Sequence, residues 1–183
     1  MNQDLATIEP IEETIDRLID RLRQNRGDLT IHATDLSGWS LGARFYPLMY
    51  LLARTCGARD WITGIELSQH LLGRLNSLQI HHVFPKALLY EHGYERSEVN
   101  AIANFAFLTQ ESNLAISDKP PHEYLAEIAE RDLNLLESQW IPLEPELWRV
   151  DRYRDFLEAR RELLAKAAND LLTRLNGSEV EGA

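Results

Sequence analysis

The middle of the chain interrupts a pattern that otherwise predicts helices, and this interruption restricts the fold more than any other feature. On either side, apolar residues recur every three or four positions, as expected for helices that bury one face. Residues 78–83 and 105–109 change toward a two-residue period, which is typical of short strands. Residues 110–116 then return to a helical pattern. We therefore expect a mostly helical α+β fold, with a helical scaffold around a strand–loop–strand–helix unit at about residues 78–117.

Turn and capping residues predict the limits of the surrounding helices. Pro47 falls inside one of them, at residues 40–56, and predicts a kink or a late start because proline has no backbone N–H to donate. This segment is apolar on nearly every side, so we expect it to be the central helix of the core. Another expected helix begins at residue 7 or 9 and ends at residue 27. The remaining expected helices cover residues 61–75, 85–92, 98–103, 117–140 and 150–175.

Length and composition predict one globular domain in the cytoplasm. A chain of 183 residues can bury one full hydrophobic core, which we place over residues 1–177, followed by a flexible tail at 178–183. No stretch approaches the roughly 20 apolar residues that cross a bilayer, and the N-terminus carries no secretion signal. The single cysteine, Cys56, excludes an internal disulfide and fits a reducing compartment. We therefore expect a cytoplasmic location and no membrane partner.

The charge of the chain argues against a general nucleic-acid coat protein. The formal net charge is −10, whereas phosphate binding draws on clustered Lys and Arg. Residues 70–120 hold four basic and five acidic residues, but residues 121–183 hold eight and fourteen. Most of the acidic excess therefore lies outside the central unit, although the unit itself is not basic.

Four side chains of the central unit suit the hydrolysis of a phosphodiester. His81 and His82 end the first expected strand, and Asn104 and Asn113 flank the second. A histidine can take the proton of an attacking water because its ordinary pKa is about 6.5. A divalent ion can offset the negative charge that grows on the phosphate. Because neighbouring strand residues point to opposite faces, one histidine could face a metal while the other faces water.

This arrangement resembles the His-Asn-His (HNH) endonucleases, also called ββα-metal or His-Me finger nucleases. The resemblance rests on the run from His81 to Pro85, on Asn104, and on Asn113 nine residues later, at the start of a helix. It covers residues 78–125 best. The wider context is similar to the C-terminal region of bacterial proteins related to modification-dependent restriction endonucleases. It implies DNA as substrate, a role in restriction or defence, and a ParB-like nucleotide-hydrolysing N-terminal domain as a partner that this chain lacks.

The resemblance also implies a role for each of the four residues. His82 matches the general base, and its other ring nitrogen would be held by a backbone carbonyl. His81 and Asn113 match the metal ligands, while the amide of Asn104 matches the brace of the loop that aims His82. One divalent ion is implied, with Mg²⁺ expected. His81 stands where many relatives carry Asp, which makes Mn²⁺, Ni²⁺ or Zn²⁺ alternatives.

Other interpretations of the same residues stay open. A His-His pair alone is more often surface or core polarity than a metal site, and asparagine is common in turns and caps. Lys86 and Lys119 are weak candidates for DNA contacts, and each also suits an ordinary solvated lysine. The acidic charge favours a second hypothesis, a non-catalytic nucleic-acid-binding or assembly module that keeps the HNH fold. A closed structural zinc site is a third hypothesis, which the absence of Cys pairs disfavours.

Overall fold

The structure is a computed structural model that describes residues 17, 20–21, 24–25, 29–68 and 78–177. The chain divides into two compact units, Met1–Ile31 and His32–Ala183. The five described residues before position 26 are helical, and the rest of the helix expected up to residue 27 lies outside the described residues. The tail at 178–183 also lies outside them. The single domain expected over residues 1–177 stays a prediction.

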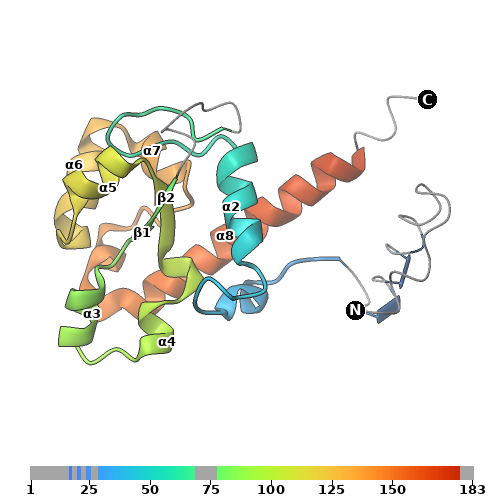
Figure 1. The fold of residues 1–183 in the computed structure, drawn as a ribbon, viewed down its shortest axis with the longest axis horizontal. Coiled ribbons are helices and arrows are strands. Elements are labelled where there is room, and N and C mark those ends of the chain that lie inside the picture. Colours follow the sequence, from blue (N-terminus) through green and yellow to red (C-terminus); the bar gives the residue numbers. More distant parts are fainter. Residues whose placement is uncertain (1–16, 18–19, 22–23, 26–28, 69–77, 178–183) are drawn as a thin grey trace. The chain divides into compact units, whose positions relative to one another are not determined.

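The second unit is mostly helical and contains a two-stranded antiparallel sheet (Figure 1). The expected α+β class is therefore confirmed at this level. The strands are β1 (Gln79–His82) and β2 (Phe105–Leu108), and helix α5 (Gln110–Ile116) follows β2 directly. The other elements, with η for a 3-10 helix, are η2 (Ala33–Ser37), α2 (Tyr46–Thr55), α3 (Lys86–Glu91), α4 (Arg96–Val99), η4 (Ile102–Asn104), α6 (Pro121–Arg131), α7 (Leu133–Glu137), η5 (Pro145–Trp148), η6 (Val150–Arg152) and α8 (Tyr153–Gly177).

Buried side chains take the place of a third strand beside β2. On the edge away from β1, the Gln139 side chain accepts from the Phe107 N–H at 3.0 Å and donates to the Phe107 carbonyl at 2.8 Å. Asp60 Oδ2 accepts from the Thr109 N–H at 2.8 Å. Two strands alone are marginally stable in water, so these bonds help to hold the sheet. The register pairs Gln79 with Leu108, Ile80 with Phe107, His81 with Ala106 and His82 with Phe105.

Local signals explain most of the connection between the strands. Pro85 caps α3, and Gly93 follows the helix at φ +77°, the left-handed region that favours glycine. The next helix differs from the one expected over residues 98–103. Glu95 and Glu98 form a capping box, so α4 begins at Arg96 and the chain then enters η4.

The long helix α8 forms the centre of the core, and the expectation that residues 40–56 would do so is wrong. α8 buries side chains along most of its length and contacts α2, η2, η4, η5 and η6 (Figure 1). In α2 only Met49, Leu52 and Ala53 are buried, while Tyr50 and Leu51 are 38% and 45% exposed. The all-round apolar pattern of α2 therefore reflects surface aromatic and aliphatic groups. Neither α8 nor any other described helix has the length and apolarity that a membrane crossing requires.

The helix expected over residues 61–75 is wrong for its described part. Asp60 Oδ1 accepts from the N–H groups of Ile62 and Thr63 at 3.2 and 2.9 Å, which closes a turn in place of a helical start. The chain then passes through Gly64, at φ +70°, and continues in extended form. Residues 69–77 lie outside the described part of the chain.

A proline and an aspartate determine two further helix limits. α2 begins at Tyr46 with Pro47 in its first turn, which confirms the late start. The helix expected over residues 117–140 is interrupted at Asp132. The Asp132 side chain accepts from the Asn134 N–H and caps α7, which is therefore a separate helix.

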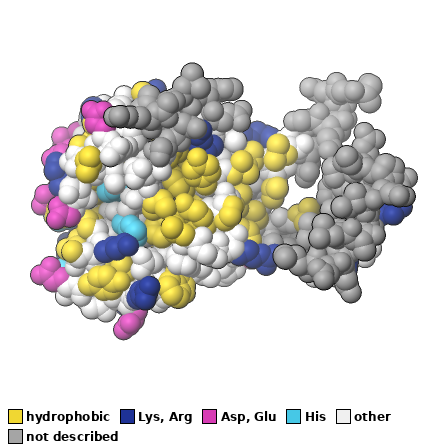
Figure 2. Space-filling view, in the orientation of Figure 1, with side chains coloured by type: hydrophobic (Ala, Val, Ile, Leu, Met, Phe, Trp, Pro, Cys, Tyr) yellow, Lys and Arg dark blue, Asp and Glu magenta, His cyan; other side chains and the backbone are white. Residues whose placement is uncertain are grey.

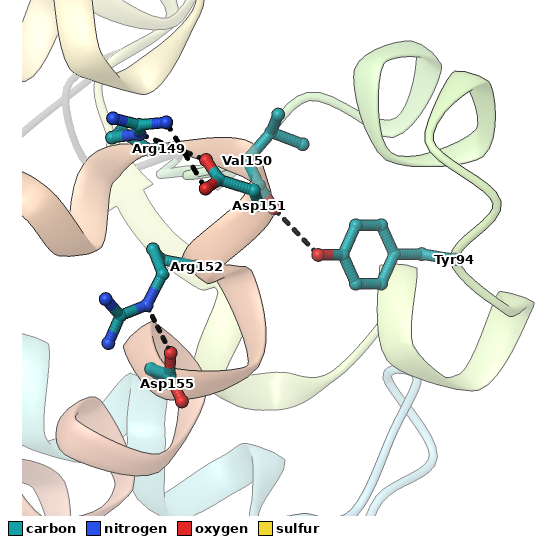
Figure 3. A network of polar contacts seen from close by, with 6 residues as sticks. All are labelled: Tyr94, Arg149, Val150, Asp151, Arg152 and Asp155. Atoms are coloured by element: carbon teal, nitrogen blue, oxygen red, sulfur yellow. Dashed lines mark hydrogen bonds and ion pairs between the residues drawn. The ribbon is translucent and has the colours of Figure 1, made fainter.

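The start of α8 is tied to the loop after α3. Figure 3 shows the Tyr94 hydroxyl directed at the Val150 carbonyl, to which it donates at 2.7 Å. Beside it, Arg149 pairs with Asp151 at 3.1 Å, and Arg152 pairs with Asp155 at 2.5 Å. The pairs are exposed and contribute little to stability. The half-buried tyrosine bond, together with the bond from the Tyr153 hydroxyl to the Glu98 carbonyl at 2.7 Å, holds this corner.

Candidate functional site

His81 and Asn113 are 32 residues apart in sequence, and the fold brings their side chains into contact. β1 supplies His81 and α5 supplies Asn113, with His81 Nδ1 2.9 Å from Asn113 Oδ1. Thr109 caps α5 by accepting from the Ser112 N–H, and its carbonyl accepts from the Asn113 N–H at 3.0 Å. The first turn of α5 is thus fixed at the end of β2, and Asn113 is directed toward β1.

Aromatic side chains enclose the imidazole of His81. Its ring lies edge-on to Trp61 and to Tyr124, with centroid distances of 5.7 and 5.8 Å. Only 3% of the residue is exposed, whereas Asn113 is half-buried. Solvent therefore reaches this pair from the side of Asn113.

The hydroxyl of Tyr124 lies near the second ring nitrogen of His81. Tyr124 donates to the Val83 carbonyl at 2.8 Å. Its oxygen is then left to accept from His81 Nε2, which lies 3.4 Å away. A neutral imidazole has a single N–H. On Nδ1 this N–H donates to Asn113 Oδ1 at 2.9 Å; on Nε2 it donates to the Tyr124 oxygen at 3.4 Å and leaves the Nδ1 lone pair facing Asn113.

The electrostatics of His81 favour a neutral ring. Burial is the main reason that the pKa of His81 falls to about 4, and the positive charge of Arg160 lowers it further. The hydrogen bond with Asn113 acts in the opposite direction and raises the pKa. At neutral pH the uncharged imidazole and Asn113 Oδ1 therefore meet at 2.9 Å, and they form a hydrogen bond when the ring proton is on Nδ1.

The His81–Asn113 pair fits a divalent ion as part of its shell. Two ligands about 2.1 Å from one ion, at a right angle, are about 3 Å apart, close to the observed 2.9 Å. Without an ion, the same 2.9 Å contact is a hydrogen bond between the imidazole and the carboxamide. Both ligands are neutral, and the described residues contain no group of three His, Cys, Asp or Glu side chains that could hold a metal. Water and phosphate oxygens would complete the shell.

His82 lies on the face of β1 opposite to His81, and its ring packs against β2. Its ring packs edge-on against Phe105, its cross-strand partner, at 4.9 Å. Nε2 of His82 is buried from solvent and has no hydrogen-bond partner among the described residues, so this histidine does not face water as expected. The expected backbone-carbonyl brace is replaced by the Asn100 side chain, whose hydrogen bond raises the pKa of His82. Burial, then the nearby Lys86 charge, outweigh that bond and lower the pKa to about 4, so the ring is neutral at pH 7.

The surface of this unit mixes histidine, basic and apolar groups. Figure 2 shows histidine side chains with a Lys or Arg beside one of them, next to an area of hydrophobic side chains. Lys86 is exposed at the start of α3 and acts on His82 through its charge. Lys119 is exposed in the turn between α5 and α6. Of the two expected DNA-contact lysines, Lys86 is the one with an interaction at the candidate site.

Asn104 joins the two sides of the loop that follows β1. Its Oδ1 accepts from the Phe84 N–H at 2.8 Å, and its Nδ2 donates to the carbonyls of Phe84 and Val99, both at 3.1 Å. The backbone N–H of Val83 also donates to the Asn104 carbonyl at 2.8 Å. Asn104 is fully buried, so it fixes the backbone two residues beyond His82.

Sequence reasoning missed three residues that build the site. Asp60 and Trp61 belong to a segment expected to start a helix, and Tyr124 belongs to an expected helix with no distinguishing spacing. Asp60 could have been found from its position before Gly64, since Asp and Gly together favour a turn. Tyr124 leaves no local signal, because its partners His81 and Val83 lie about 40 residues earlier.

Comparisons with family models, curated proteins and solved structures gave no match for this chain.

Proposed function

We propose that this protein is a metal-dependent DNA endonuclease of the HNH type, built on a central ββα-metal unit at about residues 78–117. In this proposal His82 is the general base, His81 and Asn113 hold one divalent ion, and Asn104 is the brace that aims His82. The biological setting is bacterial restriction or defence in the cytoplasm. A ParB-like nucleotide-hydrolysing domain is the proposed partner.

The observation that carries the proposal is the contact of His81 Nδ1 with Asn113 Oδ1 at 2.9 Å. The contact brings together an imidazole nitrogen and a carboxamide oxygen from distant segments, and both groups can ligate a divalent ion once the proton of Nδ1 is absent. When bound there, a divalent ion supplies Lewis-acid stabilisation of the phosphate charge. Since both protein ligands are neutral, we expect the DNA phosphate to contribute to the binding of the ion.

The proton chemistry belongs to His82. Its Nε2 is buried and has no partner among the described residues, so the step requires a water admitted to this nitrogen. That water would give its proton to Nε2 as its oxygen forms a bond to phosphorus. The P–O bond to the leaving sugar oxygen breaks, and solvent returns a proton to that oxygen. A pKa of about 4 keeps the ring unprotonated at neutral pH, and the negative charge of a bound phosphate raises this pKa toward the useful range.

A plasmid-nicking assay tests the proposal. Supercoiled DNA is incubated with the wild-type chain and the His82→Ala variant in Mg²⁺, Mn²⁺, Ni²⁺ or Zn²⁺, with a chelator as blank. We expect metal-dependent nicking that His82→Ala abolishes. The control is His122→Ala, since His122 is exposed on α6 and its side chain pairs with Glu123, outside the site. Equal nicking by wild type and His82→Ala would overturn the assigned base.

The acidic charge favours one alternative, a non-catalytic nucleic-acid-binding or assembly module. The formal net charge of −10 repels DNA and would limit cleavage by the chain alone more than it would limit weak binding or a role in assembly. DNA binding that weakens with salt, without cleavage in any of the four metals, would select this alternative.

A further inference from the structure

Asp60 is a buried carboxylate that accepts several hydrogen bonds. It is completely buried, and no Lys or Arg among the described residues pairs with it. Its Oδ1 accepts from the Ile62 N–H, the Thr63 N–H, the Thr63 hydroxyl and the Ser112 hydroxyl. Its Oδ2 accepts from the Thr109 N–H at 2.8 Å. Burial raises the pKa of Asp60, but these bonds together lower it below its ordinary value, so the group is charged at neutral pH.

The position of this charge connects it with both proposed metal ligands. Ser112, which donates to Asp60, directly precedes Asn113 in the first turn of α5. Trp61, which follows Asp60, packs against the ring of His81 at 5.7 Å. The dipeptide Asp60-Trp61 therefore supports one ligand through hydrogen bonds and the other through packing.

The negative charge of Asp60 can offset positive charge at the proposed metal site. The proposed ligands are both neutral, and the buried guanidinium of Arg160 acts on His81 as a positive charge. Arg160 donates to the carbonyls of Ala103 and Gln139, which carry no net charge. A cation at the His81–Asn113 pair is thus opposed by Arg160, and Asp60 is the buried anion that can offset it.

We propose that Asp60 is a positioning residue for metal binding: it holds the first turn of α5, and with it Asn113, and supplies the negative charge that the neutral ligands lack. This inference rests on the proposed function, because it assumes that a divalent ion binds at His81 and Asn113. Asp60 acts through α5 and through its charge, and does not touch the ion. Residues that hold metal ligands in place through hydrogen bonds commonly change metal affinity by about 10–100-fold.

The test measures Mn²⁺ binding directly, without reference to cleavage. Electron paramagnetic resonance counts free Mn²⁺ as MnCl₂ is added to the full chain, and the dissociation constant follows. Asp60→Asn removes the charge and keeps the shape. Gln139→Met is the matched control, because it removes buried hydrogen bonds to β2 and to Arg59 without changing the charge. Circular dichroism and urea denaturation report folding for each variant.

We expect Asp60→Asn to weaken Mn²⁺ binding by about tenfold or more, and Gln139→Met to leave it within about twofold while lowering stability. If Asp60→Asn does not fold, Ser112→Ala keeps the carboxylate but removes its side-chain contact with α5, and should weaken binding by about threefold. Unchanged affinity in the folded Asp60→Asn variant would overturn this inference and leave the proposed metal site standing. The same holds for Ser112→Ala if it has to replace that variant. An equal loss in Gln139→Met would do the same. A wild-type chain that binds no Mn²⁺ would overturn both this inference and the proposed metal site.

Discussion

Asn104 is the buried side chain that joins the loop after β1 to the turn before β2, and its replacement by alanine should destabilise the second unit. The substitution removes three hydrogen bonds, two with the Phe84 backbone and one with the Val99 carbonyl. Each bond contributes about 1 kcal/mol, and a buried group left unpaired costs about 1–3 kcal/mol. Because Asn104 is fully buried, water cannot replace the lost partner. We expect a loss of about 3–5 kcal/mol in the free energy of unfolding.

Urea denaturation followed by circular dichroism measures this loss, and thermal unfolding should show a fall in Tm of roughly 10 °C. Asn134→Ala serves as the control. Asn134 is exposed and its side chain donates to Asp132 at 2.9 Å, so its removal should change stability by less than about 0.5 kcal/mol. A loss below about 1 kcal/mol for Asn104→Ala would refute the claim that this amide fixes the loop.

Three further predictions concern the protonation of the two histidines. Because the pKa of His81 is about 4 in the folded chain and about 6.5 in the unfolded chain, the unfolded state binds more protons between these values. Stability should therefore fall as pH drops from about 6.5 to about 4, and urea denaturation across this range should show a smaller slope for His81→Asn. Tyr124→Phe removes the acceptor of Nε2 and should leave the proton of His81 on Nδ1, where Asn113 Oδ1 accepts it, as seen in nitrogen-15 NMR at pH 7; it should also cost about 1–2 kcal/mol of stability, and a proton on Nε2 in this variant would contradict the reasoning. Lys86→Met should raise the pKa of His82 in an NMR titration, since the Lys86 charge lowers it, whereas Lys119→Met should leave it unchanged.

The parts of the fold that were predictable from sequence depend on local chemistry. Pro85 and Gly93 delimit α3, and Thr109 caps α5, so each signal lies within a few residues of the structure it determines. The two strands were predicted from a change in period that is visible in five or six residues. The same locality places Asn113 on the first turns of a helix and His81 on a strand.

The parts that could not be predicted depend on contacts between distant segments. Asp60 turns the chain at a position where the apolar period indicated a helix, because its carboxylate finds donors in Thr109 and Ser112, about 50 residues later. The burial of α8 in place of α2 is a result of the same kind. Periodicity identifies an apolar face but does not state which partner covers it. The roles of Tyr124 and Asp60 at the candidate site therefore needed the fold.

The most direct test of the central claim is the position of a metal in a crystal of the chain. Crystals soaked in MnCl₂ and measured for the anomalous signal of manganese should show a peak about 2.2 Å from both His81 Nδ1 and Asn113 Oδ1, consistent with ordinary coordination distances. The carboxamide oxygen should face the ion, and Nε2 of His81 should keep its contact with Tyr124. A well-ordered site with no peak, or with the carboxamide NH₂ directed at Nδ1 in saturating Mn²⁺, would contradict the account.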